Sequence, residues 1–319
     1  MTTAQALAPR AFAPGSPAAT PPRRLRSLSP HLLLVANGNA SGLSRQPSLV
    51  KDSALLLRLA GARVETRVTT SLEELGHALA DAERRVVLLG GDGSLHAAAN
   101  AAANSGVRAE FALIPAGGAN NVARSLGIPV DFDAAARLAV QGAARSVDAI
   151  RVDSVAGPYL AVEGVSVGFH AFARTQYTAK NSTDKRAAIR AGFRALRDFE
   201  PPTMALSIDA SCRLATYGQV FVANMPLFGP GLQVAPADPG DALLDVVTIE
   251  GGRRAVLGLV RHLRRGTHLG RPGVSHVRAR RIKIATRGRS PIVADTTYMG
   301  DTVELTVEPQ ALDIVGGAA

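Results

Sequence analysis

The chain has 319 residues, 46% of them hydrophobic, which is enough apolar material for two packed domains. Its single cysteine, Cys212, excludes an internal disulfide and a multi-cysteine metal site, and it fits a reducing cytoplasm. No segment approaches about 20 consecutive apolar residues, so we expect no transmembrane segment.

The charge is strongly basic, with 36 Lys and Arg against 26 Asp and Glu and a net charge of +10. This balance suits a nucleic acid, an anionic membrane surface, a polyphosphate substrate, or simply a solvated arginine-rich surface. Because aromatic residues make up only 4% and do not interleave with the basic ones, we expect no nucleic-acid partner.

The first part of the chain alternates between strand-like and helix-like segments. Residues 1–30 are rich in Ala, Pro and Arg without periodicity, which predicts a disordered leader. Strands are then predicted at 31–37, 62–68, 85–90 and 111–115, and helices at 47–60, 71–82, 94–104, 119–126 and 131–141. Such alternation predicts a parallel sheet with helices on both faces.

The pattern changes after residue 145, where strand-like segments dominate. Strands are predicted at 146–153, 159–167, 203–210, 214–224, 243–250, 274–286 and 300–308, and helices at 183–199 and 253–265. The expected fold class is therefore α/β. A three-layer, parallel-sheet nucleotide-binding domain precedes a mostly antiparallel, β-sandwich-like second domain over 144–308.

A glycine-rich turn follows the predicted strand at 85–90. Gly90, Gly91 and Gly93 allow a sharp turn and a close approach of the backbone to a ligand. A strand, a glycine turn and a helix together present backbone N–H groups to a phosphate. Asp92 then faces a metal ion on the phosphates or a ligand hydroxyl, or it only caps the helix.

A second glycine-rich turn, 116–124, follows the next strand. Successive parallel strands end at one rim of a sheet, so the two turns should lie side by side where open α/β sheets bind ligands. The alternative is an ordinary helix start with Asn120 or Asn121 as its N-cap.

These motifs resemble the diacylglycerol-kinase-type lipid kinases, especially the bacterial ones. Residues 90–94 match the family's glycine-glycine-aspartate-glycine-threonine loop, with Ser94 for threonine. Residues 115–129 match its proline-x-glycine segment through Pro115, Gly117, Asn120 and the Leu-Gly-Ile-Pro run at 126–129. The resemblance extends from about residue 31 to the C-terminus. It implies that residues 309–319 return to the first domain, which would otherwise span 31–143.

The resemblance implies a lipid kinase that uses ATP and Mg²⁺. It implies catalytic roles for Asp92 and for Asp295, the latter as the base for the acceptor hydroxyl, and metal contacts for Asp92 and, at a second site, Asp241. The residues expected to bind the nucleotide are Asn37, Gly90, Gly91, Asp92, Gly93, Ser94, Gly117, Gly118 and Asn120.

Several family positions are changed. Thr297 replaces a glutamate of the active-site motif, Ala97 replaces another glutamate, and Gly118 and Asn121 replace threonine and aspartate. We therefore expect a kinase of a diacylglycerol-like hydroxyl whose activity is weakened or whose substrate is altered. The alternatives are a catalytically silent nucleotide- or lipid-binding relative, and a kinase of a soluble acceptor such as NAD or fructose 6-phosphate.

An enzyme acting on lipid would work at a membrane surface. We expect a cytoplasmic protein that visits the inner membrane face and binds a lipid substrate and ATP, and the sequence leaves a homodimer open.

Overall fold

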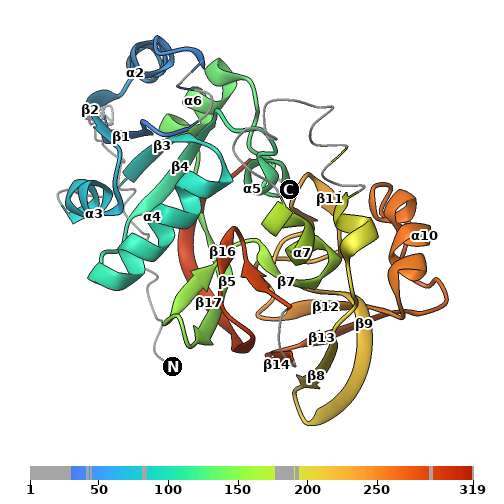
Figure 1. The fold of residues 1–319 in the computed structure, drawn as a ribbon. Helices are drawn as coiled ribbons and strands as arrows, with labels where there is room; N and C mark the ends of the chain where they lie inside the picture. The colour runs from blue at the N-terminus through green and yellow to red at the C-terminus, as the bar shows by residue number, and fades with distance from the viewer. Residues whose placement is uncertain are drawn as a thin grey trace, which may run out of the picture.

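The computed structural model describes residues 30–40, 43, 45–80, 85–176, 190, 194–286 and 290–317 (Figure 1). The predicted leader over 1–30, apart from Pro30, lies outside the described residues, and so does most of the predicted helix over 183–199.

The N-terminal part is a parallel sheet in the order β2-β1-β3-β4. Its strands are β1 (His31–Asn37), β2 (Arg63–Thr69), β3 (Arg85–Gly90) and β4 (Glu110–Pro115). The helices of this part are α2 (Leu49–Leu59), α3 (Leu72–Ala80), α4 (Asp92–Ser105), α5 (Asn121–Ser125) and α6 (Phe132–Gln141).

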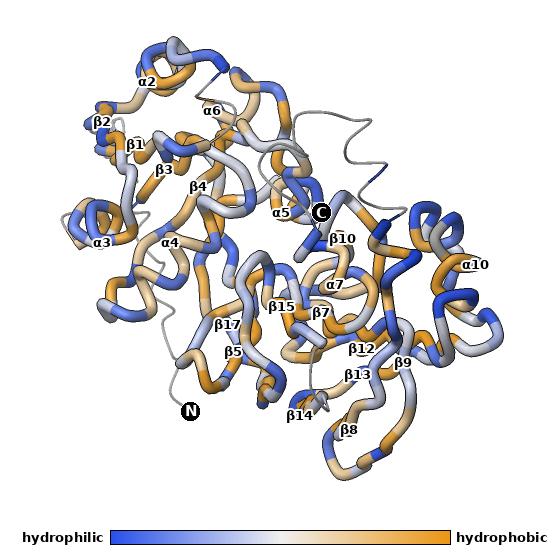
Figure 2. Tube along the Cα trace, in the orientation of Figure 1, coloured by the Kyte–Doolittle hydropathy of each residue, from blue (hydrophilic) through white to orange (hydrophobic). Residues whose placement is uncertain are grey.

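Alternation along β1 shows why both faces of this sheet are covered. Leu32 and Leu34 pack in a core cluster with α2 and α6, whereas Leu33 and Val35 pack in another with α3 and α4. Successive side chains of a strand point to opposite faces, so a continuous apolar run fits a strand that is buried on both sides. Figure 2 shows this hydrophobic character along the central strands.

The rest of the chain is mostly antiparallel. Its strands are β5 (Ala144–Ser154), β6 (Tyr159–Ala161), β7 (Gly164–Gly168), β8 (Thr203–Ile208), β9 (Ser211–Ala223), β10 (Leu227–Phe228), β11 (Leu232–Gln233), β12 (Leu244–Glu250), β13 (Val274–Ala279), β14 (Arg281–Thr286), β15 (Ile292–Ala294), β16 (Thr297–Tyr298) and β17 (Thr302–Val315). The helices described here as separate elements are α7 (Phe169–Gln176) and α10 (Arg253–Leu263).

The last strand, β17, joins the two parts. It pairs antiparallel with β5 and β14 and, near its end, parallel with β4, where Asp313 lies opposite Glu110. The predicted fold class, a parallel-sheet α/β part followed by a mostly antiparallel part, is confirmed. The predicted boundaries near 143 and 308 stay a prediction; β17 itself runs through residue 308.

Two predicted strands are interrupted in the structure. The strand predicted over 159–167 ends at Ala161 and resumes at Gly164, leaving Glu163 between β6 and β7. The strand predicted over 274–286 breaks at Arg280, because the Asp209 carboxylate accepts the N–H groups of Arg280 and Arg281. Helix α7 was not predicted.

Candidate active site

The two glycine turns lie against each other, backbone to backbone. The Ala116 N–H donates to the Gly90 carbonyl at 2.8 Å. A Cβ on Gly117 would lie only 2.6 Å from the Cα of Gly91, so this approach requires glycine at the contact. The structure therefore brings together the two turns that the sequence predicted to be neighbours.

Asp92 links the first turn to the helix that follows the second. It is the first residue of α4, and its Oδ1 accepts the backbone N–H of Val122 in α5 at 3.0 Å. Asn120 precedes α5 with a φ of 49° and folds its side chain back onto Gly117, whose N–H it accepts at 3.1 Å. Each turn is thus held by a side chain of its own sequence motif.

A cavity of about 1100 Å³ opens beside these turns. Its polar side contains most of the residues predicted to bind nucleotide, namely Asn37, Gly91, Asp92, Gly93, Ser94, Gly117 and Gly118, together with Asn121, Glu163, Asp295 and Thr296. Gly90 and Asn120 are not among its lining residues and instead support the turns from behind.

The β-rich part contributes an apolar wall to the same cavity, together with the polar side chains of His170, Arg174, Gln219 and Arg264. Phe169, Phe221, Leu232, Val256 and Leu263 line it, from α7, β9, β11 and α10. The apolar side chains of this wall suit contact with hydrocarbon.

A half-buried histidine, His170, extends this wall. The ring of His170 packs against Phe228, with 5.1 Å between the ring centroids, and its Nδ1 lies 2.9 Å from the hydroxyl of Ser166. Burial lowers the pKa of His170 to about 4, so this ring is neutral near pH 7.

Asp295 lies between β15 and β16 with a φ of 49°. Its carboxylate accepts three backbone N–H groups: Val162 at 2.9 Å on Oδ2, and Glu163 at 2.9 Å and Gly164 at 3.1 Å on Oδ1. The side chain is fully buried. Asp295 therefore joins the end of β15 to the break between β6 and β7.

The sequence analysis missed two residues of this site, Glu163 and His96. His96 Nε2 lies 3.1 Å from Glu163 Oε1 and 3.7 Å from Asp295 Oδ2, and all three side chains are buried. The other oxygen of Glu163 accepts the Asn121 side-chain N–H at 2.8 Å. A signal was present in the sequence: Glu163 is a lone carboxylate in an apolar run, and a charged side chain is rarely buried without a partner.

The changed motif position Thr297 lies outside this cluster. Thr297 is exposed in β16 and does not line the cavity, whereas Glu163 does. A carboxylate from the break between β6 and β7 thus lies beside Asp295, although the motif glutamate has been replaced.

The metal contacts stay a prediction. Asp241 does not line the cavity and forms an ion pair with Arg278. In the described part of the chain, no group of three or more His, Cys, Asp and Glu side chains is placed to hold a metal. One oxygen of Asp92 accepts the Val122 N–H, which leaves the other for a cation. One carboxylate with substrate phosphates and water is a usual environment for Mg²⁺.

The electrostatics of His96 predict that the folded protein loses stability at alkaline pH. Burial alone lowers the pKa of His96, but Asp295, Glu163 and Asp92 outweigh it and raise that pKa from 6.5 to about 9. Because the pKa of His96 is higher in the folded state, protonation of its ring stabilises the folded protein. This stabilisation is fully present below pH 6.5 and is lost as pH rises through about 9.

We therefore expect urea midpoints, measured by far-ultraviolet circular dichroism, to fall between pH 6.5 and 9 in the wild type. They should fall much less in His96→Asn, which has no imidazole to titrate. A wild-type midpoint that is flat over this range would contradict the assignment.

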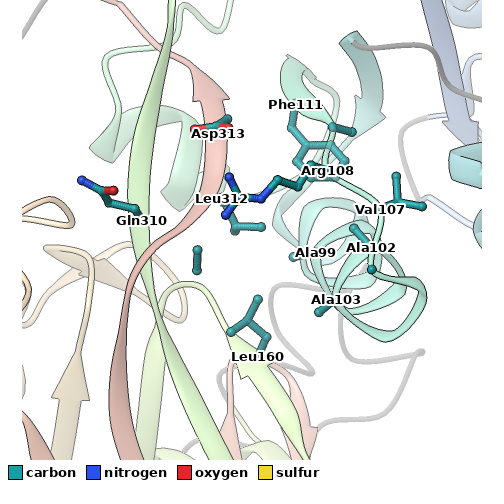
Figure 3. Close-up of a pocket in the computed structure, with 13 residues that line it drawn as sticks. Ala99, Ala102, Ala103, Val107, Arg108, Phe111, Leu160, Gln310, Leu312 and Asp313 are labelled. Carbon is teal, nitrogen blue, oxygen red and sulfur yellow. The ribbon is translucent and has the colours of Figure 1, made fainter.

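A second cavity of about 210 Å³ lies between α4 and β17 (Figure 3). Arg108, Leu160 and Leu312 line it, and it shares no lining residue with the larger cavity. It contacts neither glycine turn, so the larger cavity is the candidate active site.

Comparison with known proteins identifies two domain families in this chain. Residues 31–152 match the diacylglycerol kinase catalytic domain family, and residues 163–316 match the YegS C-terminal NAD kinase beta sandwich-like domain family. A probable YegS-like lipid kinase of Stenotrophomonas maltophilia is 28% identical over 88% of this chain and 90% of its own length. An uncharacterised protein of Synechocystis is 25% identical over 89% of this chain and 69% of its own.

Solved structures share the fold. A candidate diacylglycerol kinase from Bacillus anthracis superposes with a TM-score of 0.75 at 17% identity, covering 90% of this chain and 95% of that one. A second structure, of a diacylglycerol kinase from the same organism, superposes with a TM-score of 0.65 at 16% identity over 90% and 97%. Among the described residues, no helix is long and apolar enough to cross a bilayer.

Proposed function

We propose, because this chain belongs to the bacterial diacylglycerol and lipid kinase family, that it transfers the γ-phosphoryl group of ATP to the hydroxyl of a diacylglycerol-like lipid. One observation carries this proposal: a single cavity joins both glycine turns to an apolar wall. The turns suit a triphosphate and the wall suits acyl chains, so the phosphate donor and a lipid acceptor would meet in one cavity.

The nucleotide is proposed to lie along the two turns. Backbone N–H groups at the start of α4 carry partial positive charge and favour phosphate oxygens. Ser94 adds a hydroxyl, which receives the side-chain N–H of Asn37 at 3.4 Å. Phosphoryl transfer requires mainly positioning and charge stabilisation, which these groups supply.

Mg²⁺ would be held by Asp92 together with the phosphates. A bound Mg²⁺ supplies neutralisation of the charge that develops on the transferring phosphoryl group. Asp92 itself stays fixed by the Val122 N–H. The acceptor of the hydroxyl proton lies in the cluster of Asp295, Glu163 and His96.

The lipid is proposed to enter from an anionic membrane surface. Helix α10 contributes Val256 and Leu263 to the apolar wall, and Arg264, the residue after the helix, also lines the cavity. It also carries Arg253, Arg254 and Arg261. A helix with apolar and basic residues suits contact with acidic headgroups, which would place the protein on the cytoplasmic membrane face.

The test is transfer of labelled γ-phosphate from ATP with Mg²⁺ in mixed micelles. Diacylglycerol, monoacylglycerol, ceramide and sphingosine are offered beside NAD and fructose 6-phosphate. We expect a labelled lipid, with diacylglycerol as the best acceptor, and no labelled NAD or sugar.

Two other results would reject this function in different ways. Label in NAD or fructose 6-phosphate alone would make the protein a kinase of a soluble acceptor. ATP binding with no labelled product would make it a silent relative.

A further inference from the structure

We propose that Glu163 takes the proton from the acceptor hydroxyl and that Asp295, where the family resemblance placed this role, is a positioning residue. This inference rests on the proposed lipid kinase function. It assigns roles within one cluster and does not depend on which lipid is phosphorylated.

The first step is that three backbone N–H groups hold the Asp295 carboxylate. Two N–H groups occupy Oδ1, and one N–H group and the imidazole of His96 face Oδ2. A carboxylate has about four lone-pair sites. Its side chain is also fully buried, so the Asp295 carboxylate is held more fully by the backbone than that of Glu163, which accepts one side-chain N–H.

The second step is that Glu163 lies next to the phosphate-binding turns. Its Oε2 accepts the side-chain N–H of Asn121, the first residue of α5. The next residue of α5, Val122, donates its backbone N–H to Asp92. The carboxylates of Glu163 and Asp92 are thus anchored to consecutive residues of one helix. Both line the large cavity.

The third step is that Glu163 is held rigidly. Its carbonyl accepts the N–H groups of Asn224 at 3.0 Å and Met225 at 3.1 Å, while its own N–H donates to Asp295. Glu163 lies in the break between β6 and β7 and is therefore not part of either strand. Asp295 maintains the break, which is why we assign it a positioning role.

The electrostatics are compatible with a proton acceptor. Burial raises the pKa of Glu163, His96 lowers it, and Asp92 and Asp295 raise it further, so that the net shift is upward. A base is most effective when its pKa lies near the working pH. His96 from α4 is the cation that allows Glu163 and Asp295 to lie together.

The reaction balances without another reagent. The lipid oxygen forms a bond to the γ-phosphorus as its O–H proton passes to a carboxylate oxygen of Glu163. The bond from that phosphorus to the β,γ-bridging oxygen breaks, and ADP leaves with the electron pair. Glu163 later releases the proton to water.

The experiment compares Glu163→Gln with Asp295→Asn. Glutamine preserves the size of Glu163 and its oxygen can still accept from Asn121. We expect a lower urea midpoint, because His96 loses an anionic partner, but an unchanged ATP affinity of the folded fraction, whose kcat falls about 100- to 10,000-fold. The acid limb of the wild-type kcat–pH profile should disappear. Asp295→Asn should lower the urea midpoint, because its amide nitrogen would face the Val162 N–H, and its folded fraction should keep kcat within about tenfold.

The matched control is Asp245→Asn. Asp245 is another buried carboxylate that pairs with a histidine, His276, but it does not line the cavity. Its kcat should equal that of the wild type.

Three results would overturn the inference. They are a Glu163→Gln enzyme within tenfold of wild type, an unchanged acid limb, or a folded but inactive Asp295→Asn enzyme beside an active Glu163→Gln enzyme. A wild type that phosphorylates no acceptor would instead reject the proposed function, and the inference with it.

Discussion

Replacing Gly117 with alanine should destabilise the fold by about 3 kcal/mol and abolish ATP binding, because backbone meets backbone at this contact. The new Cβ would lie 2.6 Å from the Cα of Gly91, and no side-chain rotation can relieve such an approach. The turns must then separate, which also moves the N–H groups that are proposed to face the phosphates.

The measurement is urea unfolding followed by far-ultraviolet circular dichroism, which suits a chain without tryptophan, together with titration of ATP. Two matched substitutions separate the close approach from the loss of a glycine. At Gly76, in the middle of α3, an added Cβ meets nothing within 4 Å. Gly76→Ala should therefore stabilise by about 1 kcal/mol and leave activity unchanged.

Gly118, one residue beyond Gly117, also has open space around its Cβ position. Gly118→Ala should therefore keep the wild-type urea midpoint. If Gly117→Ala unfolds at that same midpoint, the two turns do not touch as described.

The glycine turns could be predicted because their signal is local. A continuous apolar run followed by Gly90 and Gly91 fixes a buried strand and the turn after it within a few residues. The meeting of the two turns then follows from parallel strand order, in which the carboxyl ends share one rim. The positions of Asp92 and of the first sheet could therefore be predicted from the sequence.

The cluster of His96, Glu163 and Asp295 could not be predicted in the same way. His96, Glu163 and Asp295 come from three elements, and Glu163 lies 67 positions after His96. The local sequence pattern predicts that Glu163 belongs to a strand, because its neighbours in the sequence are apolar. Instead, the 162–164 backbone donates its N–H groups to Asp295, the strand is interrupted there, and the Glu163 side chain lines the cavity. Tertiary contacts here override the local preference for continued pairing.

The strand break at Arg280 has a similar cause. Asp209, in the turn between β8 and β9, accepts two N–H groups from a segment more than 70 residues away. The run over 274–286 looks like one strand because its composition is uniform, and no residue within it marks the break. Long-range hydrogen bonds of this kind determine element boundaries that periodicity cannot locate.

The second large effect is expected at Asp92. Asp92→Asn should keep the fold and lower kcat about 100- to 1000-fold, because it removes the charge proposed to face Mg²⁺ but retains an oxygen for the Val122 N–H. Loss of activity without loss of stability would therefore report the missing charge. Magnesium should tighten ATP binding to the wild type and tighten it much less in the variant. The ATP affinity with and without magnesium is therefore a measurement that does not depend on turnover.

Asp131→Asn is the matched control for this charge. Asp131 also lies at the start of a helix and accepts a backbone N–H, that of Ala134 at 2.9 Å, but it does not line the cavity. Asparagine is as good an N-cap as aspartate, so this variant should match the wild type in stability, activity and magnesium response. If Asp92→Asn also keeps full activity, the carboxylate acts only as a bridge between α4 and α5. The phosphate charge would then have to be neutralised by other groups of the cavity.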